Sequence, residues 1–377
     1  MRVFFSTGEA SGELLAVELL GALRTRVAVE ARGIGDERLA RADVEIVQRT
    51  RGWASIGLMD ALRNIPRLGF AAVRNALRLR ADPPDVVVLV DFGAFNVRFA
   101  RMLRRLGYAR PIVYYAPPSA WLDNPKRARA VASLSDPLTL FGHQAAFYRG
   151  LGLPIGYVGH PLVSTIAARA PRPAAPPDGG VVALLPGSRG AEIARHTPRL
   201  LDAIARVREV RPNVRAVMVA ADDDAQRHME HLLSFRSPLP VEIARDARAV
   251  LRAADAAAIA SGTAVLEAAL VETPAVALYV LSKAQMKLAR RIYRGRYVTL
   301  PNLVLDEPIV PELLQEAASP AALADALLGL LADPASQRDG YARVRAALGP
   351  ADALQRNAEW VLRTVAESQA VGAVLPA

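Results

Sequence analysis

The chain of 377 residues is long enough for about two domains of ordinary size. Hydrophobic residues make up 52% and charged residues 22%, which excludes a disordered or collagen-like chain. The sequence has no cysteine, which excludes disulfide frameworks, Cys-ligated zinc, iron–sulfur clusters and thiol catalysis. The formal net charge is +10, and all but three of the 47 basic residues are arginine. This balance favours an anionic partner, such as nucleic acid, a phosphorylated metabolite or an anionic membrane surface.

Several classes of protein are disfavoured by missing patterns. No run of 18 apolar residues is free of charge, and the N-terminal apolar run is too short for a secretory signal, so we expect the chain to stay in the cytoplasm. Nucleic acid is not expected as a partner, because no helix-turn-helix signal, aromatic platform or zinc finger is present. The five histidines lack the spacing of a zinc site, so we expect neither a metal nor a cofactor.

Short apolar runs alternate with longer amphipathic stretches along the whole chain, which predicts an α/β fold built from βα units and parallel sheets. In the first half, the pattern predicts strands over 3–6, 85–90 and 111–115 and a helix over 12–26. In the second half, it predicts strands over 181–185, 214–220 and about 256–260, helices from about 191 and from 263, and a helical tail over 352–369.

A proline-rich stretch divides these two halves. It cannot hold a helix or an interior strand, so it is the best linker in the sequence. We therefore expect an N-terminal Rossmann-like domain (1–168), a linker (169–180) and a C-terminal Rossmann-like domain (181–349), with a final helix (350–377) that packs back on the first domain. Ligands of such sheets bind at the carboxyl ends of the strands, which predicts a cleft between the two domains.

The first predicted strand runs through Gly8 and Gly12 into a helix, as expected where backbone N–H groups approach a ligand. The loop has neither the dinucleotide fingerprint nor the lysine of a P-loop. Its two acids, Glu9 and Glu13, suit sugar hydroxyls or acid–base chemistry better than phosphate. The alternative is a tight βα turn with solvated acids.

Two junctions in the second half favour a nucleoside diphosphate. In the first, Gly187 and Gly190 flank a hydroxyl and a guanidinium that can grip phosphates. In the second, a small turn precedes Glu267, whose carboxylate can accept two ribose hydroxyls. The residues concerned are Gly187, Ser188 and Arg189 in the first junction and Ser261, Gly262, Thr263 and Glu267 in the second.

Two segments, 56–70 and 281–297, combine apolar and basic residues at helical spacing. Such amphipathic helices favour a membrane surface. The alternative for both is a surface helix whose apolar stripe faces the core.

The ordered set of junctions resembles the lipid-A-disaccharide synthase family, glycosyltransferases of the GT-B type with two Rossmann-like domains facing each other across a cleft. The resemblance covers most of the chain and rests on residues 8–12, 113–117, 158–162, 184–189, 261–264 with Glu267, 300–303 and 309–315.

The resemblance implies an inverting, metal-independent hexosyltransferase. It would move diacylated glucosamine from UDP to the 6-hydroxyl of a diacylated glucosamine 1-phosphate, giving a β-1,6 disaccharide and UDP. By position, Ser188 and Arg189 would hold the diphosphate, the 261–267 turn the nucleotide, Asn302 and Gln315 the donor side, and Glu9 and Ser11 the acceptor. The resemblance also implies a homodimer, peripheral on the cytoplasmic face of the inner membrane.

One motif departs from the family. The family pattern after the central strand is Asp-x-Pro-Asp-Phe-Asn, but the second acid, a candidate base, is Ala94 here. An inverting transfer needs a group that takes the acceptor proton. Either Asp91, Glu9 or Asp123 serves as this base, or the chain is a divergent enzyme with another sugar nucleotide or acceptor, a related epimerase, or a nucleotide-binding paralogue with little activity.

Overall fold

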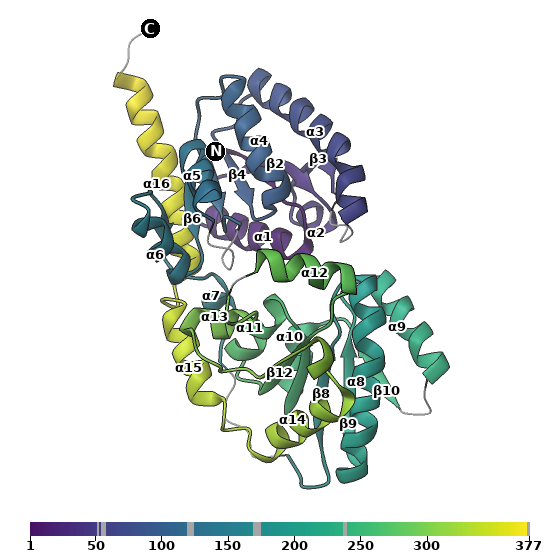
Figure 1. Cartoon of the computed structure of the whole chain (residues 1–377). Helices are drawn as coiled ribbons and strands as arrows, with labels where there is room; N and C mark the ends of the chain where they lie inside the picture. Colours follow the sequence, from purple (N-terminus) through teal and green to yellow (C-terminus); the bar gives the residue numbers. More distant parts are fainter. Residues whose placement is uncertain are drawn as a thin grey trace. The chain divides into compact units, whose positions relative to one another are not determined.

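The structure is a computed structural model that describes residues 1–50, 53, 58–118, 124–168, 175–236, 240–293 and 295–374. The chain divides into two compact units, the first made of Met1–Thr165 with Leu348–Ala377 and the second of Ile166–Ala347 (Figure 1). Each unit is a parallel sheet with helices on both faces. Within the described residues, no helix is long and apolar enough to cross a membrane.

The first unit has a sheet of seven strands in the order β3-β2-β1-β4-β5-β6-β7, and every described pairing is parallel. The strands are β1 (Arg2–Ser6), β2 (Glu30–Gly35), β3 (Glu45–Arg49), β4 (Val86–Val90), β5 (Ile112–Tyr115), β6 (Asp136–Thr139) and β7 (Gly156–Tyr157). The helices are α1 (Ala10–Arg24), α2 (Glu37–Arg41), α3 (Leu58–Ala81), α4 (Gly93–Arg105), α5 (Pro125–Leu134), α6 (Gly142–Gly150), α7 (Leu162–Thr165) and α16 (Ala353–Val374).

The central strand β4 explains how this unit forms two core layers. Its five residues are all fully buried, and successive side chains point to opposite faces of the sheet. Val86, Val88 and Val90 pack with α1 and α16, whereas Val87 and Leu89 pack with α3 and α4. The apolar, mostly β-branched run of β4 therefore suits a strand that is covered on both faces.

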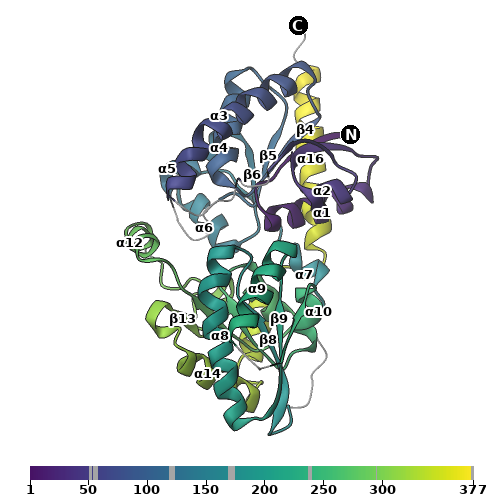
Figure 2. The same cartoon turned by 90° about the vertical axis from the view of Figure 1, so that its right-hand side faces the viewer.

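The last helix, α16, belongs to the first unit although it ends the chain (Figure 2). Ala358, Val361 and Val365 are buried in the same core as α1. The Asn357 amide donates to the Gly159 carbonyl oxygen at 3.1 Å. The end of the chain thus completes a core that begins at the N-terminus.

The second unit has a sheet of six strands in the order β10-β9-β8-β11-β12-β13, again with parallel pairings. The strands are β8 (Gly179–Leu185), β9 (Asn213–Val219), β10 (Val241–Ala244), β11 (Ala256–Ala260), β12 (Ala275–Tyr279) and β13 (Glu312–Leu314). The helices are α8 (Gly190–Val210), α9 (Asp223–Arg236), α10 (Ala247–Ala253), α11 (Thr263–Leu270), α12 (Lys283–Ile292), α13 (Leu300–Leu305), the 3-10 helix η1 (Gln315–Ala317), α14 (Pro320–Ala332) and α15 (Arg338–Ala347).

Both sheets reverse their strand order at one point, between β1 and β4 in the first unit and between β8 and β11 in the second. The crevice beyond the carboxyl ends at such a point is where α/β sheets bind ligands. The loops singled out in the sequence follow these four strands.

The expected strands and helices of the core are present, with boundaries that shift by a few residues. The helix after the first strand begins at Ala10 instead of residue 12, and β8 begins at Gly179, so the expected linker (169–180) ends inside a strand. Residues 169–174 of that linker lie outside the described residues.

Candidate active site

In the first unit, the loops after β1 and β4 are in direct contact. A Cβ atom at Gly8 would lie 2.1 Å from the Phe92 ring, so only glycine fits there. Phe92 in turn stacks on Trp53, with ring centroids 6.3 Å apart. The glycine predicted to let a ligand approach therefore also admits an aromatic side chain of the neighbouring loop.

Asp91 directly precedes Phe92 and has an unusual backbone conformation. Asp91 and Phe92 have φ angles of 46° and 40°, in the left-handed region that non-glycine residues rarely adopt. The fully buried Asn96 donates to the carbonyl oxygens of Ser6, Val90 and Asp91 at 3.0–3.2 Å, and accepts from the Ser6 hydroxyl at 2.6 Å. These bonds tie the ends of β1 and β4 together and hold the strained turn.

The Asp91 carboxyl has the electrostatics of a base that works near neutral pH. Burial, together with the nearby Glu9 carboxylate, raises the pKa of Asp91 to about 6. A general base is most effective when its pKa is close to the operating pH. Asp91 therefore stays a candidate base.

The two glutamates after β1, Glu9 and Glu13, differ in burial and in their hydrogen-bond partners. Glu9 is half-buried at the N-cap position of α1, and Ser11 is exposed in the first turn of that helix. Glu13 is buried and caps α2 by accepting from the backbone N–H groups of Asp36 and Arg38. The expectation that both Glu9 and Glu13 offer carboxylates to a ligand is thus wrong for Glu13.

Ala94 is exposed in the first turn of α4, three residues after Asp91. Its methyl group offers no proton acceptor. Asp123, the third candidate base, lies outside the described residues.

In the second unit, the loop after β8 is shaped by Gly187. This residue has φ +110°, and a Cβ atom there would lie 2.6 Å from Oε2 of Glu192, so both the backbone and the space require glycine. Ser188 is exposed, and the half-buried Arg189 is the N-cap residue of α8. The loop thus presents a hydroxyl, a guanidinium and the N-terminus of a 21-residue helix.

Two buried residues of α8 fix this loop, and the sequence analysis did not assign them a role. Glu192 accepts from Arg189 at 3.1 Å and from the Tyr279 hydroxyl at 3.0 Å. His196 contacts the Pro186 carbonyl oxygen through Nδ1 at 2.7 Å and accepts from the Val280 N–H through Nε2 at 3.0 Å. Their spacing of four residues, which puts them on one face of α8, was the available signal.

The loop after β11 lies next to the loop after β8, because the strands pair directly. The Ser261 hydroxyl donates to the Val298 carbonyl oxygen at 3.2 Å, Gly262 is exposed and Thr263 begins α11. Glu267 is buried, and its Oε1 accepts from Nε and Nη2 of Arg248 at 3.2 and 3.1 Å. Glu267 therefore already has an ion-pair partner, which the ribose interpretation did not foresee.

The donor-side candidates Asn302 and Gln315 lie in different settings. The Asn302 amide is buried and bonds Val310 through both its nitrogen and its oxygen, and Glu312 through its nitrogen. The Asn302 side chain thus holds the 310–312 segment, and its place on the donor side stays a prediction. Gln315 is half-buried with φ +56°, directly after β13 at the edge that carries the two loops.

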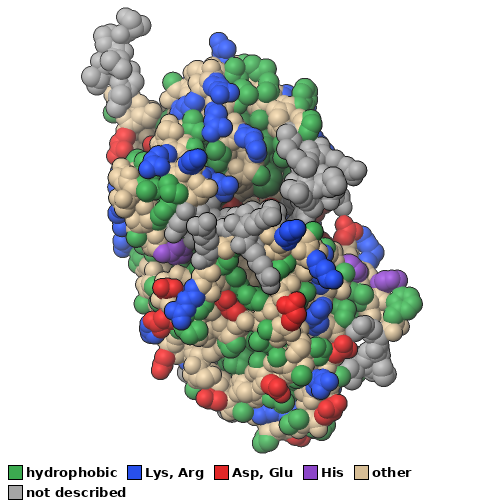
Figure 3. Space-filling view, viewed as in Figure 1, with side chains coloured by type: hydrophobic (Ala, Val, Ile, Leu, Met, Phe, Trp, Pro, Cys, Tyr) green, Lys and Arg blue, Asp and Glu red, His purple; other side chains and the backbone are tan. Residues whose placement is uncertain are grey.

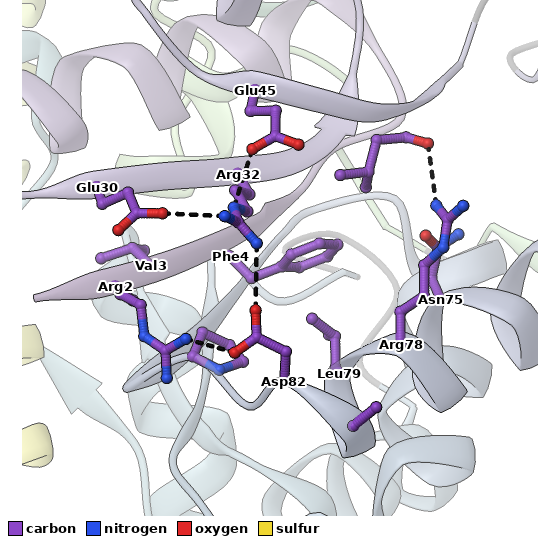
Figure 4. A pocket seen from close by; sticks show the side chains of 13 residues that line it. Arg2, Val3, Phe4, Glu30, Arg32, Glu45, Asn75, Arg78, Leu79 and Asp82 are labelled. Carbon is purple, nitrogen blue, oxygen red and sulfur yellow. Dashed lines mark hydrogen bonds and ion pairs between the residues drawn. The ribbon is translucent and has the colours of Figure 1, made fainter.

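A cavity of about 520 Å³ opens elsewhere in the first unit, at the amino ends of β1, β2 and β3 (Figure 4). Its rim pairs charges with one another: Arg32 contacts Glu30, Glu45 and Asp82 at 2.9–3.2 Å, and Arg2 contacts Asp82. Ligands of parallel sheets bind at the carboxyl ends of the strands. This cavity lies at the amino ends, so we do not expect it to hold the substrates of the expected sugar transfer.

No group of three or more His, Cys, Asp or Glu side chains that could hold a metal ion is found within the described part of the chain.

Comparison with known proteins identifies the family. A family model described as lipid-A-disaccharide synthetase matches residues 3–359. The lipid-A-disaccharide synthase of Pseudomonas aeruginosa (strain UCBPP-PA14) is 36% identical over 374 residues, covering 97% of this chain and 98% of that protein. That of Azotobacter vinelandii (strain DJ / ATCC BAA-1303) is 37% identical over 377 residues, covering 96% and 97%.

The chain belongs to the lipid-A-disaccharide synthase family. The resemblance found in the sequence is therefore confirmed, and so is the assignment to the glycosyltransferases.

Solved structures show the same fold at low sequence identity. The UDP-GlcNAc 2-epimerase of Neisseria meningitidis, solved with bound UDP-GlcNAc, has a TM-score of 0.63 at 11% identity and covers 96% of this chain and 100% of its own. The glycosyltransferase SnogD of Streptomyces nogalater has a TM-score of 0.52 at 18% identity, covering 97% and 99%. The predicted α/β architecture of GT-B type, with two Rossmann-like units, is confirmed by these likenesses.

The raised pKa of Asp91 predicts an effect on stability. The folded state disfavours the ionised form of Asp91. Asp91→Asn should therefore raise the free energy of unfolding of this protein above pH 6, by about 1–3 kcal/mol at pH 8. The gain should vanish near pH 4, where the carboxyl is protonated in the native protein. Thermal melting at both pH values measures it, with the exposed Asp325→Asn as the control. A lower melting temperature for Asp91→Asn at pH 8 would contradict the buried-charge interpretation.

Proposed function

We propose that this chain condenses UDP-2,3-diacylglucosamine with 2,3-diacylglucosamine 1-phosphate to a β-1,6-linked lipid A disaccharide 1-phosphate and UDP. The observation that carries the proposal is the match to lipid-A-disaccharide synthases over 97% of the chain. The two loop sets at the switch points of the sheets support it, since one offers a carboxyl group with a raised pKa and the other an arginine at a helix N-terminus.

In the proposed reaction, Asp91 takes the proton of the acceptor 6-hydroxyl. The oxygen attacks C1 of the donor sugar from the side opposite UDP, so the α-linked donor gives a β product. The bond from C1 to the phosphate oxygen breaks, and its electron pair leaves with UDP. Asp91 is proposed as the base because Ala94 offers no proton acceptor and because the pKa of Asp91 is raised to about 6.

The departing UDP develops negative charge in the transition state. Arg189, the Ser188 hydroxyl and the backbone N–H groups between Gly187 and the first turn of α8 are proposed to stabilise it. Ser261, Gly262 and Thr263 are proposed to hold the nucleotide, with Gln315 on the donor side. Glu9 and Ser11 are proposed to contact the acceptor, and the charge of Glu9 also keeps the pKa of Asp91 high.

The test of the function is an assay with both acylated substrates, followed by detection of the disaccharide. Formation of the disaccharide with release of one UDP per product is expected. Unacylated UDP-N-acetylglucosamine should release no UDP. UDP release from that compound, without disaccharide from the acylated pair, would instead favour an enzyme with another acceptor.

Arg189→Ala should weaken UDP binding by about 1.5–3 kcal/mol, the range for a hydrogen bond assisted by charge. Isothermal titration calorimetry with UDP measures the change. Arg206→Ala, an exposed arginine on the same helix, is the matched control and should leave the Kd unchanged. An unchanged Kd for Arg189→Ala would remove this residue from the diphosphate site.

If Asp91 is the base, Asp91→Asn should lower turnover about 100- to 10,000-fold, the usual contribution of a positioned base. The rate of the unmodified enzyme should rise with pH through about 6, because only the ionised carboxylate accepts a proton. Glu9→Gln should move this rise to lower pH, since it removes a like charge.

Ala94→Asp should change turnover by no more than a few-fold, because Asp91 already accepts the proton. A hundredfold increase in turnover would show that the carboxylate at position 94 is the better base, and would assign Asp91 a lesser role.

We also propose a peripheral position on the cytoplasmic face of the inner membrane. The outer face of α3 exposes Phe70, Val73 and Leu77 at helical spacing, with 69%, 38% and 50% of each side chain accessible. Arg67 and Arg74 lie on the same helix, and in the second unit α12 exposes Lys283 and Lys287. Figure 3 shows basic and hydrophobic side chains over the first unit, in the upper part of that view, with few acidic ones. Apolar side chains beside cations suit anionic lipids.

Phe70→Asp should reduce sedimentation of the protein with vesicles of phosphatidylglycerol and phosphatidylethanolamine, because the variant loses apolar contact and adds a repelled charge. Val210→Asp is the matched control, since Val210 is 64% exposed at the end of α8 in the other unit. Equal sedimentation of both variants would exclude α3 from the lipid contact.

The proposed homodimer rests on the family resemblance, and sedimentation equilibrium measures it. A mass of about twice 40.4 kDa is the expected result.

A further inference from the structure

Glu192 places a carboxylate inside the loop proposed to bind the diphosphate. It lies in the first turn of α8, three residues after Arg189, and only 8% of it is exposed. Its Oε1 accepts from Nη1 of Arg189 at 3.1 Å and from the Tyr279 hydroxyl at 3.0 Å. Its Oε2 lies close to Gly187, where no Cβ would fit. The carboxylate thus contacts the arginine of the loop, the glycine of the loop and the end of β12.

Its surroundings hold Glu192 in this place. Burial and the Glu192 charge raise the pKa of Tyr279 to about 12, so the Tyr279 hydroxyl stays protonated and keeps donating. One turn further along α8, the fully buried His196 joins the Pro186 carbonyl oxygen to the Val280 N–H. Hydrogen bonds therefore join α8, the loop after β8 and the end of β12 around the Glu192 carboxylate.

This placement has an electrostatic consequence. A helix N-terminus and an arginine attract an anion, and in this structure the anion beside them is Glu192 itself. A diphosphate bound to the same guanidinium would lie close to a carboxylate of like charge, and the two would repel each other.

We propose that Glu192 is a positioning residue that stands in for the diphosphate. It holds Arg189 in the loop while UDP is absent, and its charge weakens the hold on UDP so that the product can leave. The proposal rests on the proposed donor site, because it requires Arg189 to contact the diphosphate. If Glu192 had only a structural role, every replacement should weaken UDP binding. If its charge competes with the diphosphate for Arg189, a neutral residue of the same shape should strengthen UDP binding.

Glu192→Gln separates charge from shape. The amide oxygen still accepts from Arg189 and Tyr279, but the negative charge is gone. Calorimetry with UDP should give a Kd that is about threefold to tenfold lower than that of the unmodified protein, as expected for removing one repelled charge near a partly exposed site. Glu192→Ala, which also loses the acceptor, should bind UDP more weakly than Glu192→Gln.

The matched control is Glu209→Gln, an exposed carboxylate near the end of the same helix, which should leave the Kd unchanged. The tightening by Glu192→Gln should also shrink as salt is raised, because salt screens the repulsion that the variant removes. A Kd for Glu192→Gln equal to or above that of the unmodified protein, with an unchanged melting temperature, would overturn the proposal.

Tyr279→Phe gives a second measurement with the opposite sign. It removes the neutral donor that shares Oε1, so Glu192 should hold Arg189 more strongly and UDP should bind about two- to threefold more weakly. If Glu192→Gln does not fold, tighter or unchanged binding by Tyr279→Phe would overturn the proposal.

Arg189→Ala distinguishes a failure of the proposed donor site from a failure of the role proposed for Glu192. If this variant binds UDP as well as the unmodified protein, the donor site itself is wrong. If it binds UDP more weakly while Glu192→Gln does not bind more tightly, the donor site stands and only the role of Glu192 fails.

Discussion

In each unit, one buried polar side chain joins the ends of two structural elements at the edge where the proposed chemistry takes place. Asn96 ties the end of β1 to the end of β4 and holds the left-handed turn at Asp91. His196 ties the glycine loop after β8 to the end of β12. Both residues come from the helix that follows the loop they fix. An unpaired polar group in these positions would be costly, so these bonds favour the observed arrangement of each loop.

The fold and the general position of the site could be predicted from the sequence, because both depend on local patterns. Alternating apolar runs predict parallel strands, and glycines directly after a strand predict a loop that approaches a ligand. Gly8 and Gly187 illustrate the limit of this reasoning. The sequence indicates that glycine is needed, but only the structure shows that Phe92 and Glu192 occupy the space.

The partners of buried charges could not be predicted, because they are set by the fold and not by spacing along the chain. Glu13 and Asp36 are 23 residues apart, and Glu267 and Arg248 are 19 apart. Nothing in the local sequence distinguishes a carboxylate that caps a helix from one that faces a ligand. The same reasoning explains Asp91, whose raised pKa arises from burial and from Glu9 on another strand end.

The return of α16 to the first core has a consequence for the architecture of the chain. The second unit is one uninterrupted segment, Ile166–Ala347, inserted into the first, whereas the first unit is assembled from both ends of the polypeptide. A ribosome therefore completes the second unit before the first has all its parts. A fragment that ends after the insertion lacks the part of this core that α16 supplies, although α1 still covers the same face of the sheet. The inserted segment, in contrast, can be excised as a single gene fragment.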